Sequence, residues 1–268
     1  MCGRFAMNKE TDDLILEFIA RGGDPQEWRP SYSVSPTDEA PIIRQRAPKA
    51  DAGSAEAASA ETGSAGAAAG ETREIELAQW GLKPAWAKPK GPAPINARLE
   101  TVATNGMFRS AFASHRCIVP MIGYYEWQQQ DDGKQPYFIH GDADVLAAAG
   151  LYSARKDDAG EWKVTFTIVT REAADASGAI HERMPVFLTP DLWAPWLDPT
   201  KITNADPVLT ALDRSSLAVA KSITTYPVAR TVNNSRTLDP FDAHLIEPIE
   251  LDDDLAGVDV RTGEFLDG

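Results

Sequence analysis

The chain is poor in cysteine, with only Cys2 and Cys117 among its 268 residues. Two cysteines cannot form the dense disulfide framework of a small secreted domain, so we expect a reducing, cytoplasmic environment. The four histidines show no metal-ligand spacing, and the sequence predicts neither a metal nor another cofactor. No apolar run approaches the roughly 18 residues of a membrane span, which argues against a membrane partner.

Basic residues are also scarce. The chain has 26 Lys and Arg against 40 Asp and Glu, a formal net charge of −14, and such acidity is unusual for a protein that binds nucleic acid. Much of the acid lies near the end of the chain, however. We therefore predict one domain at 2–240 followed by an acidic tail at 241–268, and a basic groove within the domain stays possible.

Residues 47–73 contain no aromatic and no large aliphatic side chain, and Ala, Gly, Ser and Glu dominate this stretch. Such a segment cannot bury a core face, so it predicts a disordered insertion within a surface loop of the domain. A helix through the alanines is the alternative interpretation.

Short β-rich segments dominate the rest of the chain, and helical patches interrupt them without a repeated strand–helix–strand pattern. The expected strands cover 41–46, 74–82, 117–126, 136–140, 145–153, 163–170 and 217–226. One helix is expected to begin near Thr11, and three others are expected at 107–114, 172–178 and 190–197. This pattern predicts an α+β fold: one compact, mixed, mainly antiparallel β-rich domain with peripheral helices.

Cys2 is the most reactive candidate, because removal of Met1 would make it the N-terminus. Its thiol and its α-amine, with ordinary pKa values of about 8.5 and about 7.7–8.0, would then lie on adjacent carbons. A 1,2-aminothiol condenses with an aldehyde to a five-membered thiazolidine. The same residue could instead attack an amide, with its own amine as the base.

Four other features carry reactive side chains in order: Arg4 beside Cys2, the stretch PINARLET at 94–101, GYYEW at 123–127 and IHERMP at 180–185. Each also has a plain structural interpretation. Arg98 and Glu100 could form a surface pair, and His181 could be an ordinary structural histidine.

Together with CGRF at 2–5 and WGL at 80–82, these motifs closely resemble the SRAP family, the SOS-response-associated peptidases that act as abasic-site processing proteins. The resemblance spans roughly 2–240 without the insertion. It implies an SRAP-like fold in which Cys2 crosslinks to abasic sites in single-stranded DNA through a thiazolidine, with autopeptidase and lyase-type activity. It also implies a monomer that is cytoplasmic and lies at the nucleoid when bound to DNA.

The resemblance further implies a role for individual residues. The catalytic residues would be Cys2, Asn96, which orients the amine, Glu126, which shuttles protons, and His181, which protonates the sugar oxygen. Arginines would hold the phosphates, other side chains would stack on bases or wedge the strand apart, and Thr170 would lie near Cys2. These DNA-contacting residues are Arg4, Arg98 and Arg183 for phosphates, and Pro36, Trp80, Trp86, Met107, Phe108 and Trp127 for bases. For Trp80, packing in the core is an equally open interpretation.

The chain departs from the family pattern at Ser33, Ser35 and Gly106, which leaves its DNA affinity open. Two other functions also stay open. Met-Cys-Gly opens N-terminal-nucleophile amidohydrolases such as glutamine amidotransferases, although Arg4 stands where those chains usually have an aliphatic residue. The second alternative function is a module that binds single-stranded DNA non-covalently and in which Cys2 does not react.

Overall fold

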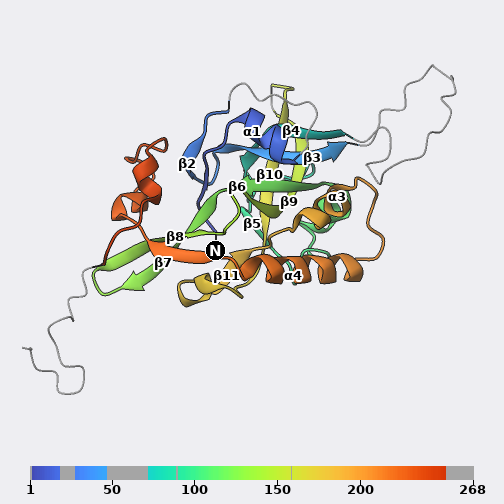
Figure 1. Cartoon of the computed structure of the whole chain (residues 1–268). Helices are drawn as coiled ribbons and strands as arrows, with labels where there is room; N and C mark the ends of the chain where they lie inside the picture. The colour runs from blue at the N-terminus through green and yellow to red at the C-terminus, as the bar shows by residue number, and fades with distance from the viewer. Residues whose placement is uncertain (1, 19–27, 47–71, 89, 158, 252–268) are drawn as a thin grey trace, which may run out of the picture.

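A computed structural model describes residues 2–18, 28–46, 72–88, 90–157 and 159–251 of the chain. Within these ranges, two β-sheets meet near the start of the chain and helices cover their outer faces (Figure 1).

The first sheet has five strands in the order β12-β8-β7-β1-β2, and all of its pairings are antiparallel. Its strands are β1 (Phe5–Met7), β2 (Ser31–Val34), β7 (Gly123–Gln130), β8 (Gly133–His140) and β12 (Thr224–Pro227). The β7–β8 hairpin turns at Gly133, whose φ of +130° is a conformation that glycine adopts without strain.

The second sheet has seven strands: β3 (Glu39–Arg46), β4 (Thr72–Trp80), β5 (Asn96–Arg98), β6 (Arg116–Met121), β9 (Leu146–Lys156), β10 (Trp162–Glu172) and β11 (Arg183–Pro185). β10 pairs with both β4 and β9, so the order β10-β4-β3-β6-β9 closes on itself. β4 and β5 run parallel to β10, and the other pairings are antiparallel. The predicted fold class is confirmed.

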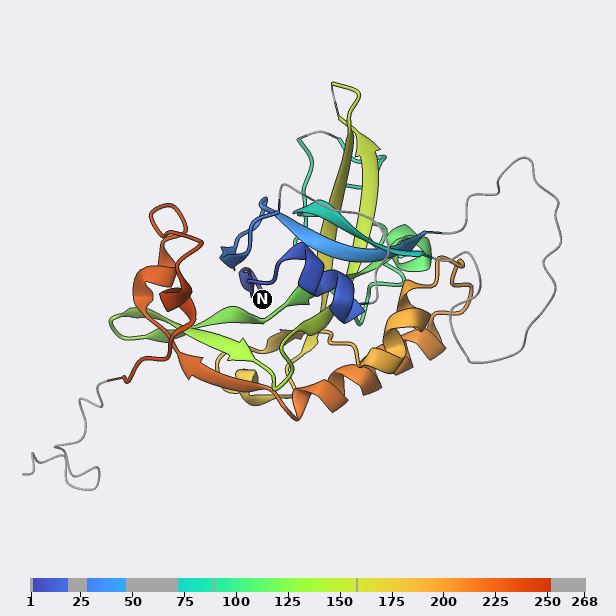
Figure 2. The ribbon, with the colours of Figure 1, turned by 45° about the horizontal axis from the view of Figure 1, so that its top comes forward.

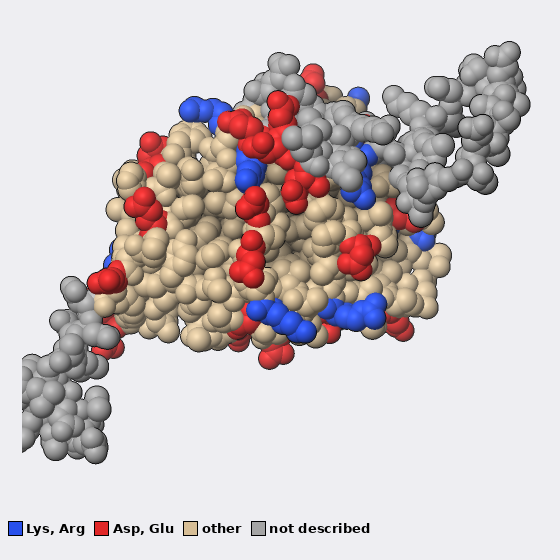
Figure 3. Space-filling view, in the orientation of Figure 1, with Lys and Arg blue, Asp and Glu red and all other residues tan. Residues whose placement is uncertain are grey.

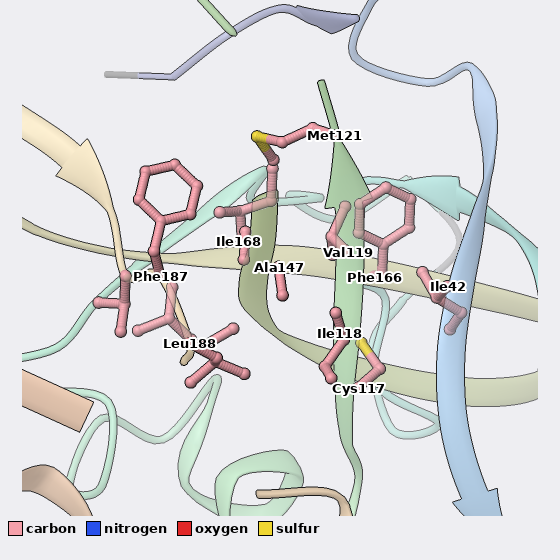
Figure 4. Close-up of a cluster of buried hydrophobic side chains, with 14 of the residues drawn as sticks. Ile42, Cys117, Ile118, Val119, Met121, Ala147, Phe166, Ile168, Phe187 and Leu188 are labelled. Carbon is pink, nitrogen blue, oxygen red and sulfur yellow. The ribbon is translucent and has the colours of Figure 1, made fainter. Parts of the chain in front are cut away.

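The hydrophobic core lies inside the closed sheet. Figure 4 shows side chains from β3, β6, β9 and β10 that point toward one another, with Phe187 and Leu188 beside them. Cys117 is among these buried residues, as a strand thiol is expected to be.

The helices lie outside the sheets, and Figure 2 shows the longest one, α4, running along one side of the molecule. The α-helices are α1 (Thr11–Phe18), α2 (Arg109–Ser114), α3 (Pro190–Leu197) and α4 (Asp206–Ala220). The short 3-10 helices are η1 (Ala176–Ala179), η2 (Arg230–Asn233) and η3 (Ala243–Ile246). None of the helices in the described ranges has the length and apolarity needed to cross a bilayer.

Three predicted elements were wrong in part. The strand expected at 217–226 is reduced to β12, because α4 extends to Ala220. The helix expected at 172–178 is the 3-10 turn η1, since β10 extends to Glu172. The strand expected at 117–126 divides into β6 and β7, which belong to different sheets. Gly123 permits this change of sheet, because a Cβ there would lie 2.6 Å from the carbonyl oxygen of Ile139.

The predicted segment boundaries also shift. Most of the predicted insertion falls outside the described residues, but Thr72 and Arg73 pair with Arg46 and Gln45 and so extend the β3–β4 hairpin. Within the predicted acidic tail, Leu245 is buried in a second apolar cluster. The rest of that tail, 252–268, lies outside the described residues.

Candidate functional site

Cys2 is fully buried just before β1. It lies along β7, since Phe5 pairs with Tyr124 and the Arg4 carbonyl accepts a hydrogen bond from the main chain of Tyr125. From β5, Asn96 Nδ2 donates a hydrogen bond of 2.8 Å to the carbonyl oxygen of Cys2. Two strands far apart in sequence therefore hold the candidate nucleophile.

Glu126 lies beside Cys2. Side chains alternate along a strand, so Tyr124 and Glu126 share one face of β7 while Tyr125 and Trp127 occupy the other. Burial raises the pKa of the Glu126 carboxyl to about 7. Burial, and after it the charge of Glu126, raises the pKa of the Cys2 thiol above its ordinary value. The site therefore holds a neutral thiol next to a carboxyl that exchanges its proton near neutrality.

His181 follows η1, and its Nδ1 accepts a hydrogen bond of 3.0 Å from the main-chain N–H of Arg183. A neutral imidazole with an occupied acceptor at Nδ1 carries its proton on Nε2, so Nε2–H is the donor that faces away from that bond. Burial lowers the pKa of His181, which favours this neutral form.

β10 brings the parts of the site together. Ile168 to Thr170 pairs with Asn96 to Arg98 in β5, and Thr170 also pairs with Pro185 in β11, close to His181. Thr170 is fully buried. Its hydroxyl and the Oδ1 of Asn96 have no hydrogen-bond partner among the described residues. Buried polar atoms without partners are uncommon, and a bound ligand is one way to satisfy them.

The three arginines predicted to bind phosphates have different surroundings. Arg98 is exposed on β5. Arg183 donates to both carboxylate oxygens of Glu100, at 2.7 and 3.0 Å, and to the Thr170 carbonyl at 2.7 Å. Glu100 therefore pairs with Arg183, and not with Arg98 as the plain structural alternative had it. Arg4 is buried and donates to the Val232 carbonyl, because the residues before β1 run through the interior.

The predicted base-contacting residues also divide into exposed and buried side chains. Trp86 is 65% exposed, whereas Trp80 is fully buried and packs edge-on against Phe5 in the core. Phe108 is also buried, because it packs into the core at the start of α2. Trp80 and Phe108 therefore pack in the core of this structure, and for Trp80 this is the alternative that the sequence left open; contact of either residue with DNA stays a prediction. The half-buried residues of this set are Pro36, Met107 and Trp127.

Comparisons with known proteins show the family of this chain. The family model described as SOS response associated peptidase (SRAP) matches residues 1–235. The chain belongs to the SRAP family. It is 32% identical over 245 residues to the abasic site processing protein YoqW of Bacillus subtilis, covering 90% of this chain and 97% of that one. Abasic site processing protein YedK of Escherichia coli is 29% identical over 257 residues, covering 93% and 100% of the two chains.

A solved structure of a protein from Bacteroides thetaiotaomicron superposes on this SRAP chain with a TM-score of 0.69 at 22% identity. The match covers 93% of this chain and 100% of the other. At this identity, the likeness establishes the shared fold only.

Several residues around the SRAP site were not predicted from the sequence. Tyr124 lies between the motif glycine and Glu126 and donates a hydrogen bond to Ser177, while Asp175 caps η1. The Asp-x-Ser sequence is a typical capping signal and could have located this turn. Glu100 belongs to the motif at 94–101, but nothing in the sequence reveals that its partner is Arg183.

Among the described residues on the face that Figure 3 shows, acidic and basic side chains form small, separate groups and no broad basic area. Recognition of a phosphate backbone on that face would therefore depend on a few placed arginines. Within the described residues, no group of three or more His, Cys, Asp or Glu side chains is arranged to hold a metal ion.

Proposed function

We propose that this SRAP protein processes abasic sites in DNA, and that Cys2 captures the lesion covalently in single-stranded DNA. Membership of the family and the names of the relatives support the first part. The observation that carries the second is the burial of the Cys2 thiol beside Glu126, a carboxyl whose pKa of about 7 suits proton transfer at neutral pH.

The chemistry begins with hydrolysis of the bond between Met1 and Cys2, which consumes one water and frees the α-amine. The open form of an abasic sugar presents an aldehyde. The amine adds to its carbon and water leaves, which gives an imine. The thiol then adds to the same carbon: the new C–S bond closes the five-membered ring, and the thiol proton passes to the ring nitrogen. From the free aminothiol onward, the protein and the DNA together lose one water.

The neighbouring residues match these steps. The buried thiol stays neutral near pH 7, so it needs a proton acceptor, and ionised Glu126 provides one. Protonated Glu126 can return a proton when water leaves. His181 can donate its Nε2 proton to the sugar oxygen as the ring opens. Asn96 holds the main chain of Cys2, which keeps the reacting atoms in a fixed geometry.

DNA would be held by exposed and semi-exposed groups around this core. Arg98 is free to contact a phosphate, and Arg183 is oriented by Glu100 at the edge of the site. Trp86 offers an exposed ring on which a base can stack. These contacts suit a single strand, which presents its bases as well as its phosphates.

Denaturing electrophoresis of the mature protein with single-stranded DNA that carries one abasic site tests this function. We expect a heat-stable shifted band with abasic DNA, no band with intact DNA, and none with Cys2→Ala. Cys2→Ser should form at most a reversible imine. A Cys2→Ala protein that still forms the adduct would refute the mechanism. Absence of any adduct, together with Cys2-dependent glutamine hydrolysis, would favour an amidohydrolase, and equal non-covalent affinity for both DNAs would favour a binding module.

A further inference from the structure

A buried chain of hydrogen bonds runs from the strand of Glu126 to the turn before His181. The Tyr124 hydroxyl donates to Ser177 Oγ at 3.1 Å, and Ser177 Oγ donates in turn to Asp175 Oδ1. The main-chain N–H of Ser177 donates to the same carboxylate oxygen at 2.9 Å. Burial raises the pKa of the Tyr124 phenol, so its hydroxyl keeps the proton that it donates.

Ser177 also holds the residues that follow it. Its carbonyl oxygen accepts hydrogen bonds from the main-chain N–H groups of His181 at 2.8 Å and Ile180 at 2.9 Å. A single fully buried residue is therefore bonded through its side chain to β7 and through its main chain to His181.

We propose that Ser177 is a positioning residue, anchored by the Tyr124 hydroxyl, that fixes His181 relative to Cys2 and Glu126. This inference rests on the proposed function, because it concerns the geometry in which that site reacts. Neither Ser177 nor Tyr124 has to touch the DNA in this role.

The physical reason is the small size of the turn. η1 has four residues, and a 3-10 turn this short has few hydrogen bonds of its own. Without the Tyr124 hydroxyl, Ser177 loses its bond to β7, and the turn that carries His181 can shift. A displacement of about 1 Å in a catalytic group can slow a reaction by about 10²-fold.

The position of His181 can be read from its titration. Among the described residues, the charged groups that act on His181 are Glu182 and Arg183, and the titratable groups that act on Tyr124 are Asp175, Cys2 and Glu126. Burial is the main cause of the low pKa of His181. A turn that loosens toward solvent would relieve that burial, so the titration midpoint of His181 should rise.

The test compares two tyrosines on the same strand. Tyr124→Phe removes the anchoring hydroxyl and keeps the ring. Tyr125→Phe is the matched control: its hydroxyl is also buried, but it donates to the Tyr32 carbonyl on the opposite face at 2.7 Å. Ser177→Ala removes the link itself. For each variant we would measure the crosslinking rate at saturating abasic DNA, the half-saturating DNA concentration, and the His181 titration by NMR, assigned with His181→Gln.

We expect Tyr124→Phe and Ser177→Ala to slow crosslinking about tenfold at saturating DNA. The half-saturating concentration should stay within about twofold, and the His181 midpoint should rise, while Tyr125→Phe behaves like the parent protein. Equal effects of Tyr124→Phe and Tyr125→Phe on both rate and midpoint would overturn the inference, as would an unchanged His181 midpoint in Ser177→Ala. If the parent itself forms no crosslink, the proposed function fails, and the titration alone decides the role of Ser177.

Discussion

Asn96 donates a hydrogen bond of 2.8 Å from its side-chain amide to the main-chain carbonyl of Cys2, a residue 94 positions earlier in the chain. The same amide has an oxygen that is buried and has no hydrogen-bond partner among the described residues. One side chain thus holds the candidate nucleophile with its donor and keeps an acceptor available for a ligand. This arrangement depends on the parallel pairing of β5 with β10.

Replacement of Asn96 tests this arrangement. In Asn96→Ala, the Cys2 carbonyl loses its partner and the residue can turn away from the aldehyde. We expect crosslinking to slow by about 10- to 100-fold, as measured from the rate of adduct formation on denaturing gels. Asn204→Ala, before α4, is the control and should leave the rate unchanged. Equal rates for both variants would exclude a role for Asn96 in positioning Cys2.

The crosslinking rate should depend on pH through Glu126. Its carboxyl has a pKa of about 7, and the proposed step needs the ionised form as the proton acceptor. The rate should therefore rise as the pH increases through about 7 and level off above it. Glu126→Gln should be slow and lack this rise, whereas Glu161→Gln, at the tip of the β9–β10 hairpin, should retain it. A parent profile that is flat between pH 6 and 8, at about one unit on either side of this pKa, would contradict the role of Glu126.

The same carboxyl should influence stability in the opposite direction. Its pKa is about 7 in the fold but about 4.3 in an unfolded chain. Between these values the folded state binds more protons than the unfolded state, so the free energy of unfolding falls as the pH rises through this window. Urea unfolding of parent and Glu126→Gln at several pH values measures this effect. The slope should be smaller in the variant, and identical slopes would show that Glu126 is not protonated by burial.

Trp80 and Trp86 should respond in opposite ways to replacement by alanine. Trp80→Ala opens a cavity in the core and should cost about 3–5 kcal/mol of stability. Trp86→Ala should change stability by less than about 0.5 kcal/mol and weaken binding of single-stranded DNA by about 1–3 kcal/mol if a base stacks on the ring. Urea unfolding and fluorescence anisotropy with labelled DNA measure the two effects. Unchanged DNA affinity in Trp86→Ala would remove it from the binding surface.

The sequence motifs locate the candidate site residues, but they do not reveal the strands and hydrogen bonds that hold these residues in place. Cys2, Asn96, Glu126 and His181 belong to separate motifs that could be recognised one by one. In the structure, Asn96 bonds the main chain of Cys2, Glu126 lies beside it, and Ser177 links His181 to β7. The catalytic role of each stays a prediction. What joins them is β10, which pairs in parallel with β5 and antiparallel with β11. Such long-range pairings leave no local pattern in the sequence, so the contacts of Thr170 could not be derived from it.

α4 was missed for a different reason. Its buried face includes Ser215 and Ser216, whose hydroxyls accept hydrogen bonds from the main chain of Thr189 and Phe187. The two serines interrupt the apolar face that Val208, Leu212 and Val219 form on this helix, and this weakens the pattern that identifies an amphipathic helix. The alternating apolar residues near its end were therefore interpreted as a strand.

The most direct test of the account is the intact mass of the protein–DNA adduct. The protein would be incubated with a short single-stranded oligonucleotide that carries one abasic site and then measured by mass spectrometry under denaturing conditions. A thiazolidine at Cys2 predicts the mass of the chain without Met1, plus that of the oligonucleotide, less one water. Cys2→Ala should give no such species. An adduct that retains Met1, or one that forms equally in Cys2→Ala, would contradict covalent capture by the N-terminal cysteine.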